Sequence, residues 1–249
     1  MGAVIAGAAI IGAALGILGS GGSVLTVPVL VYGLGLAEKS AIANSLAIVG
    51  SIALFGALLE ARRGRVVLRC LLAFGLPGVA GAALGGIGTG WLPGSVQLTL
   101  FGVVAILAAV QMLYGREPAA HDSECGPLPA AVAAGAGLGV LTSLIGVGGG
   151  FLLVPALIRF GGLDLPRAIG TSLALISVNA SAGLIGQVAS PAVLALDPVT
   201  IGIFVAVGCT GMVAGQRVSR WLPRAQLRQG FVAMLVLVAG LVLLRATVG

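Results

Sequence analysis

Two short glycine-rich phrases carry the residue types in this sequence that are best suited to chemistry. The first, GSGGSVLTVP, spans residues 19–28, and the second, GVGGGFLLVP, spans residues 146–155. Consecutive glycine N–H groups can form a concave nest for an anion, and a helix that begins just beyond them adds free N–H groups and partial positive charge. We therefore expect two anion-binding turns, with candidate ligands Ser20, Gly21, Gly22, Ser23 and Thr26 in the first and Gly148, Gly149 and Gly150 in the second.

A second set of neutral polar residues follows each phrase, near the start of a long apolar segment. Asn44-Ser45 follows the first phrase and Thr171-Ser172 follows the second, with Asn179 two turns further along. These side chains could complete a shell of uncharged donors around an oxyanion. They could equally act as small hydrogen-bonding residues that hold transmembrane helices together. The sequence leaves both interpretations open.

The composition places these phrases in a membrane. The chain has 249 residues, of which 59% are hydrophobic and 8% are charged, with a mean hydropathy of +1.18. A soluble domain carries roughly 25% charged residues. Long apolar runs indicate helices rather than the alternating strands of a barrel. The lipid bilayer is thus one expected partner.

The charged and metal-binding residues exclude several classes of function. The net charge of +6 comes from basic residues in short loops, and aromatic residues are few, so no nucleic-acid partner is expected. The three cysteines show no paired spacing and the one histidine lies in a polar linker, so we expect neither a disulfide framework nor a metal site. No arrangement typical of an enzyme can be assembled, and no cofactor is expected.

The sequence contains an internal repeat. Shifting it by 127 positions takes Gly19 to Gly146, Pro28 to Pro155 and Ser45 to Ser172; beyond a three-residue insertion, Trp91-Leu92-Pro93 meets Trp221-Leu222-Pro223. A nearly constant register over about eighty residues indicates two related halves. Each half contains five apolar segments, at 3–18, 23–33, 40–60, 67–89 and 95–114, then 128–145, 150–160, 167–188, 198–216 and 228–247. The domains are predicted as a first repeat at 1–114, a linker at 115–127 and a second repeat at 128–249.

The basic loops predict that the two halves are inverted. Four arginines follow the third segment of the first half, at Arg62, Arg63, Arg65 and Arg69, whereas four follow the fourth segment of the second half, at Arg217, Arg220, Arg224 and Arg228. Short loops rich in Lys and Arg stay in the cytoplasm. The matching topology places eleven of the thirteen basic residues inside. Both termini then face outward and the linker is cytoplasmic.

The expected fold is an all-α integral membrane protein of two inverted-topology repeats, each with a broken or re-entrant helix pair plus three transmembrane helices. A full crossing needs about 20 apolar residues, so the second segment of each half is too short for one. The sequence does not decide whether the first two segments of each half cross the membrane fully or re-enter. It also leaves the oligomeric state open, and a homo-oligomer is one possibility.

Inverted repeats with broken helices are typical of secondary transporters, whose site lies at the repeat interface near the midplane. The partner expected here is a small anion, and an inside-negative potential favours its export. No carboxylate or histidine stands clearly inside a crossing as a proton carrier. The alternative function is a channel or carrier for cations or neutral solutes, in which carbonyls of unwound segments would bind the ion.

The phrases also resemble a known family. GSGGSVLTVPVL followed by AIANSLAIV, and GVGGGFLLVPAL followed by AIGTSLALIS, resemble the sulfite exporter TauE/SafE family of membrane permeases over nearly the whole chain. The resemblance implies a transporter of the bacterial inner membrane for sulfite, organosulfonates or related sulfur-containing anions. Asn44, where many members have threonine, and Ser23, in place of a third glycine, depart from the family pattern.

Overall fold

Every regular element is a helix in the part of the chain that the structure describes. The computed structural model describes residues 2–18, 23–89, 91–114, 125–145, 150–189, 196–219, 221 and 223–248. The elements are α1 (Gly2–Leu18), α2 (Ser23–Pro28), the π-helical turn η1 (Val29–Gly33), α3 (Glu38–Ala61), α4 (Leu68–Gly88), α5 (Gly94–Tyr114), α6 (Leu128–Ile145), α7 (Gly150–Arg159), α8 (Leu165–Val188), α9 (Pro198–Ser219) and α10 (Arg224–Val248). The predicted all-helical fold is confirmed.

Several of these helices are long and apolar enough to cross a membrane. Within the described residues, α3, α4, α6, α8 and α9 meet this test by length and composition. α5 and α10 contribute shorter apolar stretches to the described part, Gly94–Val110 and Val232–Val242. α2 with η1 and α7 are too short to span a bilayer core, as predicted. The chain is a multi-pass membrane protein.

α4 shows how one helix serves both lipid and protein. Four leucines spaced along one face expose half or more of their surface, at Leu68, Leu72, Leu76 and Leu84. The opposite face carries buried glycines, at Gly75, Gly78, Gly81, Gly85 and Gly86. In lipid, helices associate through close backbone packing rather than through burial of apolar surface. The leucines therefore face lipid while the glycines admit neighbouring helices.

Two glycine crossings bring helix backbones into contact. A Cβ atom placed on Gly139 of α6 would lie 2.1 Å from the carbonyl oxygen of Gly78 on α4, and one placed on Gly12 of α1 would lie 2.2 Å from that of Gly208 on α9. No side chain fits at such distances. The repeat register takes Gly12 to Gly139 and Gly78 to Gly208, so the two crossings occupy equivalent positions.

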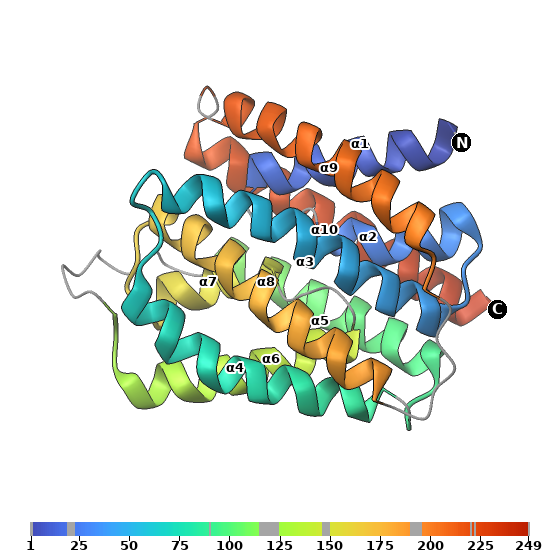
Figure 1. Ribbon diagram of the computed structural model, residues 1–249, viewed down its shortest axis with the longest axis horizontal. Coiled ribbons are helices and arrows are strands. Elements are labelled where there is room, and N and C mark those ends of the chain that lie inside the picture. The colour runs from blue at the N-terminus through green and yellow to red at the C-terminus, as the bar shows by residue number, and fades with distance from the viewer. Residues whose placement is uncertain are drawn as a thin grey trace.

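α3 and α8, the equivalent third helices of the two halves, pack against each other and run in opposite directions. A Cβ on Gly50 would lie 3.1 Å from the Cβ of Ala180. Earlier in α3, Leu46 packs beside Gly183, and later in α3, Gly56 meets Leu173. Partner numbers on α8 thus fall as those on α3 rise. In Figure 1 these two helices cross through the body of the bundle.

Each half also packs its fourth helix against the other half. α4 packs along α6 and α8, and α9 packs along α1 and α3. The loop between α3 and α4 lies at the end of the bundle opposite the two chain termini (Figure 1). Arg63 of this loop donates a hydrogen bond of 3.0 Å to the Gln216 side chain near the end of α9. The basic residues after α3 and those at the end of α9 therefore lie at the same end of the bundle.

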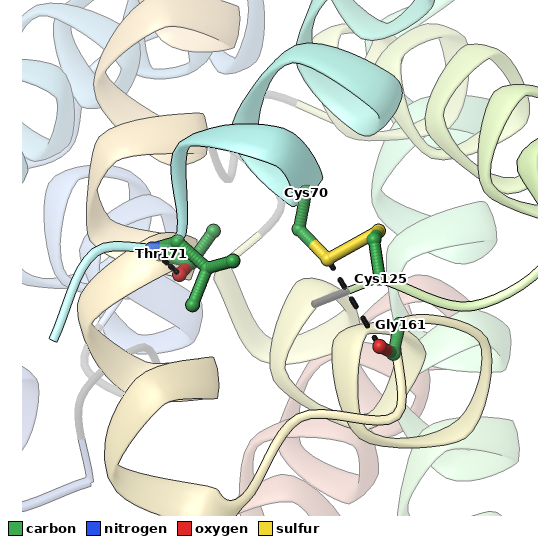
Figure 2. Close-up of a disulfide and its surroundings, with 5 residues drawn as sticks. Cys70, Cys125, Gly161 and Thr171 are labelled. Atoms are coloured by element: carbon green, nitrogen blue, oxygen red, sulfur yellow. Dashed lines mark hydrogen bonds between the residues drawn. A yellow bond between two sulfur atoms is a disulfide. The ribbon is translucent and has the colours of Figure 1, made fainter. Parts of the chain in front are cut away.

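One expectation about the cysteines is wrong. Cys70, in the first turn of α4, forms a disulfide with Cys125, and their Cα atoms lie 5.4 Å apart (Figure 2). The two cysteines lie 55 positions apart in sequence, and no local spacing indicates the pairing. Only the packing of α4 against α6 brings the residues before α6 close to the start of α4. Cys209, on α9, is a free thiol.

We predict that the glycine crossing between α4 and α6 is sensitive to a single methyl group. Gly139→Ala places a Cβ against the Gly78 carbonyl and should destabilise the protein by about 1–3 kcal/mol, as overpacking does in cores. Gly137→Ala on the same helix is the matched control, because nothing lies within 4 Å of its added Cβ. Thermal unfolding in detergent measures both. Equal melting temperatures for the two variants would contradict the crossing.

Candidate functional site

The two short helices begin at the positions that the glycine phrases predict. Ser23 is the first residue of α2 and Gly150 is the first residue of α7. Ser23 and Thr26 are fully buried. Ser20, Gly21, Gly22, Gly148 and Gly149 lie outside the described residues, so the predicted nests themselves stay a prediction. α2 and α7 pack against each other, which brings the two phrases together from distant parts of the sequence.

Both short helices contain a proline and end in the same way. Pro28 closes α2 and is followed by η1, since its missing N–H breaks the regular hydrogen-bond ladder. Beyond η1 the Leu36 N–H donates to the Leu30 carbonyl, and beyond α7 the Leu163 N–H donates to the Leu157 carbonyl, each at 3.2 Å. Only glycine adopts the intervening left-handed turn at low cost, and Gly35 and Gly162 have φ of 69° and 66°.

Asn44 and Thr171 cap helices of the opposite half. The Asn44 Oδ1 atom accepts a hydrogen bond of 3.0 Å from the Asp197 N–H, just before α9. The Thr171 Oγ1 atom accepts one of 3.0 Å from the Val67 N–H, just before α4 (Figure 2). The repeat register takes Asn44 to Thr171 and, with the insertion, Val67 to Asp197. One contact therefore occurs twice, and it satisfies a backbone donor that a helix start leaves unpaired.

The capped end of α9 is also stabilised by its own carboxylate. The Asp197 side chain accepts hydrogen bonds from the N–H groups of Val199 and Thr200 and from the Thr200 hydroxyl. The Thr200 hydroxyl, followed by the Thr200 N–H, lowers the pKa of Asp197 below its ordinary value. Because the folded-state pKa is the lower one, this carboxylate stabilises the protein above its unfolded pKa. The contribution is lost as the pH falls through the folded pKa.

The structure does not bring Asn44 and Thr171 together. Leu173 of α8 contacts Gly56 of α3. Because the two helices are antiparallel, Thr171, two residues before Leu173, lies level with a residue about two positions after Gly56. About fourteen residues of α3 then separate the levels of Asn44 and Thr171, which is roughly 20 Å at 1.5 Å per residue. Asn179 lies next to Ala180 and therefore level with Gly50, near the middle of α3.

Three of the predicted ligands are buried and lack a hydrogen-bond partner among the described residues. These atoms are the Thr26 Oγ1, the Ser45 Oγ and the Asn179 Oδ1. Buried polar atoms in proteins are nearly always paired with protein, water or a bound ion. Ser172, by contrast, donates its hydroxyl to the Ile169 carbonyl at 2.8 Å. The first half thus offers two unpaired hydroxyls where the second half has Leu153 and a satisfied serine.

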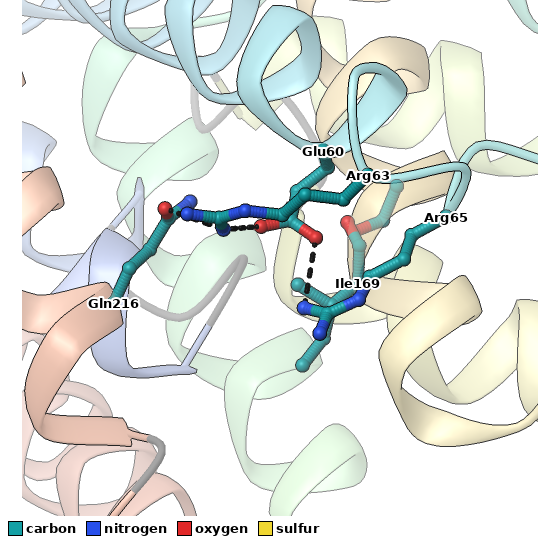
Figure 3. A network of polar contacts seen from close by, with 6 residues as sticks. Glu60, Arg63, Arg65, Ile169 and Gln216 are labelled. Atoms are coloured by element: carbon teal, nitrogen blue, oxygen red, sulfur yellow. Dashed lines mark hydrogen bonds and ion pairs between the residues drawn. The ribbon is translucent and has the colours of Figure 1, made fainter.

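A buried carboxylate lies at the basic end of the bundle. Glu60 is 3% exposed, and its side chain forms ion pairs with Arg63 and with Arg65, the latter at 3.1 Å (Figure 3). Arg63 also reaches Gln216 of α9, so the group ties the end of α3 to the end of α9. Glu60 is the penultimate residue of α3 and therefore lies at the end of that helix. Both guanidinium groups balance its charge.

Sequence reasoning missed a second buried polar group. Ser143 and Gln187 are each 1% exposed, and the Gln187 amide nitrogen donates to the Ser143 carbonyl at 3.2 Å. The Ser143 hydroxyl and the Gln187 side-chain oxygen have no partner among the described residues. The available signal was a polar residue inside an apolar segment, together with the register that takes Glu60 to Gln187.

Similarity to known proteins shows the family to which the chain belongs. The family model described as "Sulfite exporter TauE/SafE" matches residues 4–242. The chain belongs to the TauE/SafE family. The chain is 35% identical over 169 residues to a "Probable membrane transporter protein" of Xylella fastidiosa strain 9a5c, and 33% identical over the same length to the protein of that description in strain Temecula1. No solved structure matches the chain.

The matches to the two relatives are partial. Each match covers 66% of this chain and 65% of the relative, so the matched part falls just short of two thirds of their length. Both relatives are described as membrane transporters, and neither description names a substrate. The chain is therefore a multi-pass membrane protein of the TauE/SafE family.

We predict that Thr171 acts as a helix cap in this TauE/SafE protein. Thr171→Val removes the hydroxyl that accepts from the Val67 N–H and should lower the free energy of unfolding by about 1 kcal/mol, as loss of a cap does. Thr171→Ser keeps the acceptor and should cost less. Thermal unfolding of the two purified variants makes the comparison, and a Val variant as stable as the Ser variant would refute the cap.

Proposed function

We propose that this TauE/SafE protein exports small anions across a bacterial inner membrane, with sulfite and organosulfonates as the best candidates. The substrate would bind near the middle of the bilayer, between two inverted repeats. The observation that carries the proposal is the set of unpartnered polar atoms on Thr26, Ser45 and Asn179, buried inside a bundle of apolar helices. Family membership supports the choice of sulfur-containing anions.

The directions of the helices support the inversion of the repeats. α3 and α8 are equivalent by the repeat register yet run antiparallel, which two halves of opposite topology require. The equivalent crossings of α1 with α9 and of α4 with α6 fit the same two-fold relation. We infer that a pseudo-two-fold axis in the membrane plane passes between α3 and α8. Such an axis is typical of secondary transporters with a midplane site.

The distribution of charge supports the proposed orientation. Arg62, Arg63 and Arg65 lie at the end of α3, and Arg217 lies at the end of α9, joined to the same group through Gln216. Both chain termini lie at the other end of the bundle (Figure 1). By the positive-inside rule the arginine-rich end faces the cytoplasm. The termini would then face outward.

The proposed site suits an anion better than a cation. Hydroxyl groups can turn their protons toward an oxyanion, and the α2 and α7 N-termini add partial positive charge. Among the described residues, the buried carboxylate is Glu60, and its two arginines neutralise it. A cation site would need several carbonyl or carboxylate oxygens, whereas the Asn179 Oδ1 is one amide oxygen beside two hydroxyl groups. The two short helices touch, so one substrate could contact both repeats.

Electrical driving force tests the proposed function directly. In proteoliposomes loaded with sulfite, we expect an inside-negative potential to accelerate efflux, because 100 mV supplies about 2.3 kcal/mol per unit charge. Parallel assays with an organosulfonate and with sodium ions separate the anion carrier from the alternative cation pathway. Flux that ignores voltage and follows a pH gradient, or that moves sodium instead, would refute the proposal.

We also predict that the unpaired hydroxyls contribute to substrate binding. Thr26→Val and Ser45→Ala should each raise the KM for sulfite efflux about tenfold, since a hydrogen bond to a charged group is worth about 1.5–3 kcal/mol. Neither variant should be less stable, because no protein partner is lost. Ser51→Ala is the matched control on α3: its exposed hydroxyl bonds to the Ala47 carbonyl. An unchanged KM in both variants would place the site elsewhere.

A further inference from the structure

The Cys70–Cys125 disulfide lies at the arginine-rich end of the bundle. Cys70 belongs to the first turn of α4 and directly follows Arg69, a few residues beyond the loop that contains Arg63 and Arg65. Cys125 lies three residues before the start of α6. The proposed orientation puts this end in the cytoplasm. Cytoplasmic thiols are kept reduced, and disulfides there are usually transient or redox-sensing.

The two cysteine residues differ in exposure. Cys70 is completely buried, whereas Cys125 is partly exposed at the edge of the bundle. Because Cys125 is the more exposed residue, we infer that an incoming thiolate attacks its sulfur, with Cys70 as the leaving group. The basic loop nearby attracts anionic thiols such as glutathione. The proposed exchange therefore begins at Cys125, while Cys70 is protected from attack by its burial.

The bond holds the segment before α6 against the turn that ends α7. The Gly126 N–H donates to the Gly161 carbonyl at 3.1 Å, and the Cys70 sulfur lies 4.0 Å from the same oxygen (Figure 2). A Cβ on Gly126 would lie 2.0 Å from the Phe160 carbonyl oxygen, so the backbone runs directly over this turn. The disulfide joins the start of α4 to the segment before α6, and the Gly126–Gly161 hydrogen bond joins that segment to the turn after α7.

We propose that Cys70 and Cys125 form a thiol–disulfide exchange site for low-molecular-weight thiols and disulfides of the cytoplasm. The oxidised pair holds the α7–α8 turn, and the reduced pair releases it. The site is separate from the substrate site and requires no particular substrate. It rests on the proposed orientation, because a disulfide on the outer side would be a permanent link.

The exchange balances with glutathione as the partner. A glutathione thiolate attacks the Cys125 sulfur, the Cys125–Cys70 bond breaks, and Cys70 leaves as a thiolate that takes up a proton. A second glutathione thiolate attacks the glutathione sulfur of the mixed disulfide, which releases oxidised glutathione and the Cys125 thiolate. Two glutathione thiols are oxidised and two cysteines are reduced. Oxidation of the pair is the reverse of these steps.

The redox state in living cells tests the site without any transport assay. Cells expressing the full chain are quenched with acid, and their free thiols are alkylated with a reagent that retards migration on a gel. We expect three free cysteines during ordinary growth and one after treatment with the oxidant diamide. Cys209→Ser is the matched control, with two free cysteines falling to none. A Cys70–Cys125 bond already complete during ordinary growth would overturn the proposal.

Hydrogen exchange tests the effect on the α7–α8 turn. In the purified protein, reduction with glutathione should speed amide exchange at residues 160–163 about tenfold, as expected when a local restraint is removed. Oxidised glutathione should reverse the change. Cys125→Ser should exchange at the fast rate under both conditions, and Cys209→Ser should respond as the unaltered protein does. Identical exchange in the oxidised and reduced proteins would refute the release of the turn.

Discussion

The contact between glycine backbones is the constraint on which the rest of the structure depends. In lipid, apolar side chains gain little by leaving the bilayer for a protein interior, so helices must hold together by close packing. Gly78 and Gly139 meet without side chains between them, and Gly12 and Gly208 do the same at the equivalent position. These contacts fix α4 on α6 and α1 on α9. The abundance of glycine in the sequence, 42 residues, is explained in part by such crossings.

Because the crossings join helices of different halves, neither half forms a separate packed unit. α4 completes the bundle of the second half and α9 completes that of the first. The two caps follow from the same packing of each fourth helix against the other half: Thr171 caps the start of α4, and Asn44 caps the start of α9. A side chain predicted as either a ligand or a helix contact thus has a definite structural task. Capping a helix of the other half accounts for the polar residue in the first part of α3 and of α8.

The sequence was sufficient to predict the helices, because long apolar runs and the internal register are local or repetitive signals. Glycine phrases and prolines likewise predicted the short helices. The Cys70–Cys125 pair and the separation of Asn44 from Thr171 depend on packing between distant segments, which the register alone does not specify. The burial of Ser143 against Gln187 depends on it too. The predicted oxyanion shell therefore included residues of two kinds: the caps Asn44 and Thr171, and buried polar groups without a partner among the described residues.

Positions that are equivalent in the two halves but carry an apolar residue in one and a polar residue in the other help to distinguish a role in binding from a role in packing. Ile52 packs against Gly208, and Asn179, its equivalent, packs against Gly78. The first pair shows that an apolar side chain fills this space, so the fold does not require an amide there. Burying an amide with an unpaired oxygen is costly in an apolar surrounding. Thr26 differs from Leu153 in the same manner. Packing explains the arrangement that the two halves share, whereas the polar member of each pair requires another reason, and the proposed substrate would supply one.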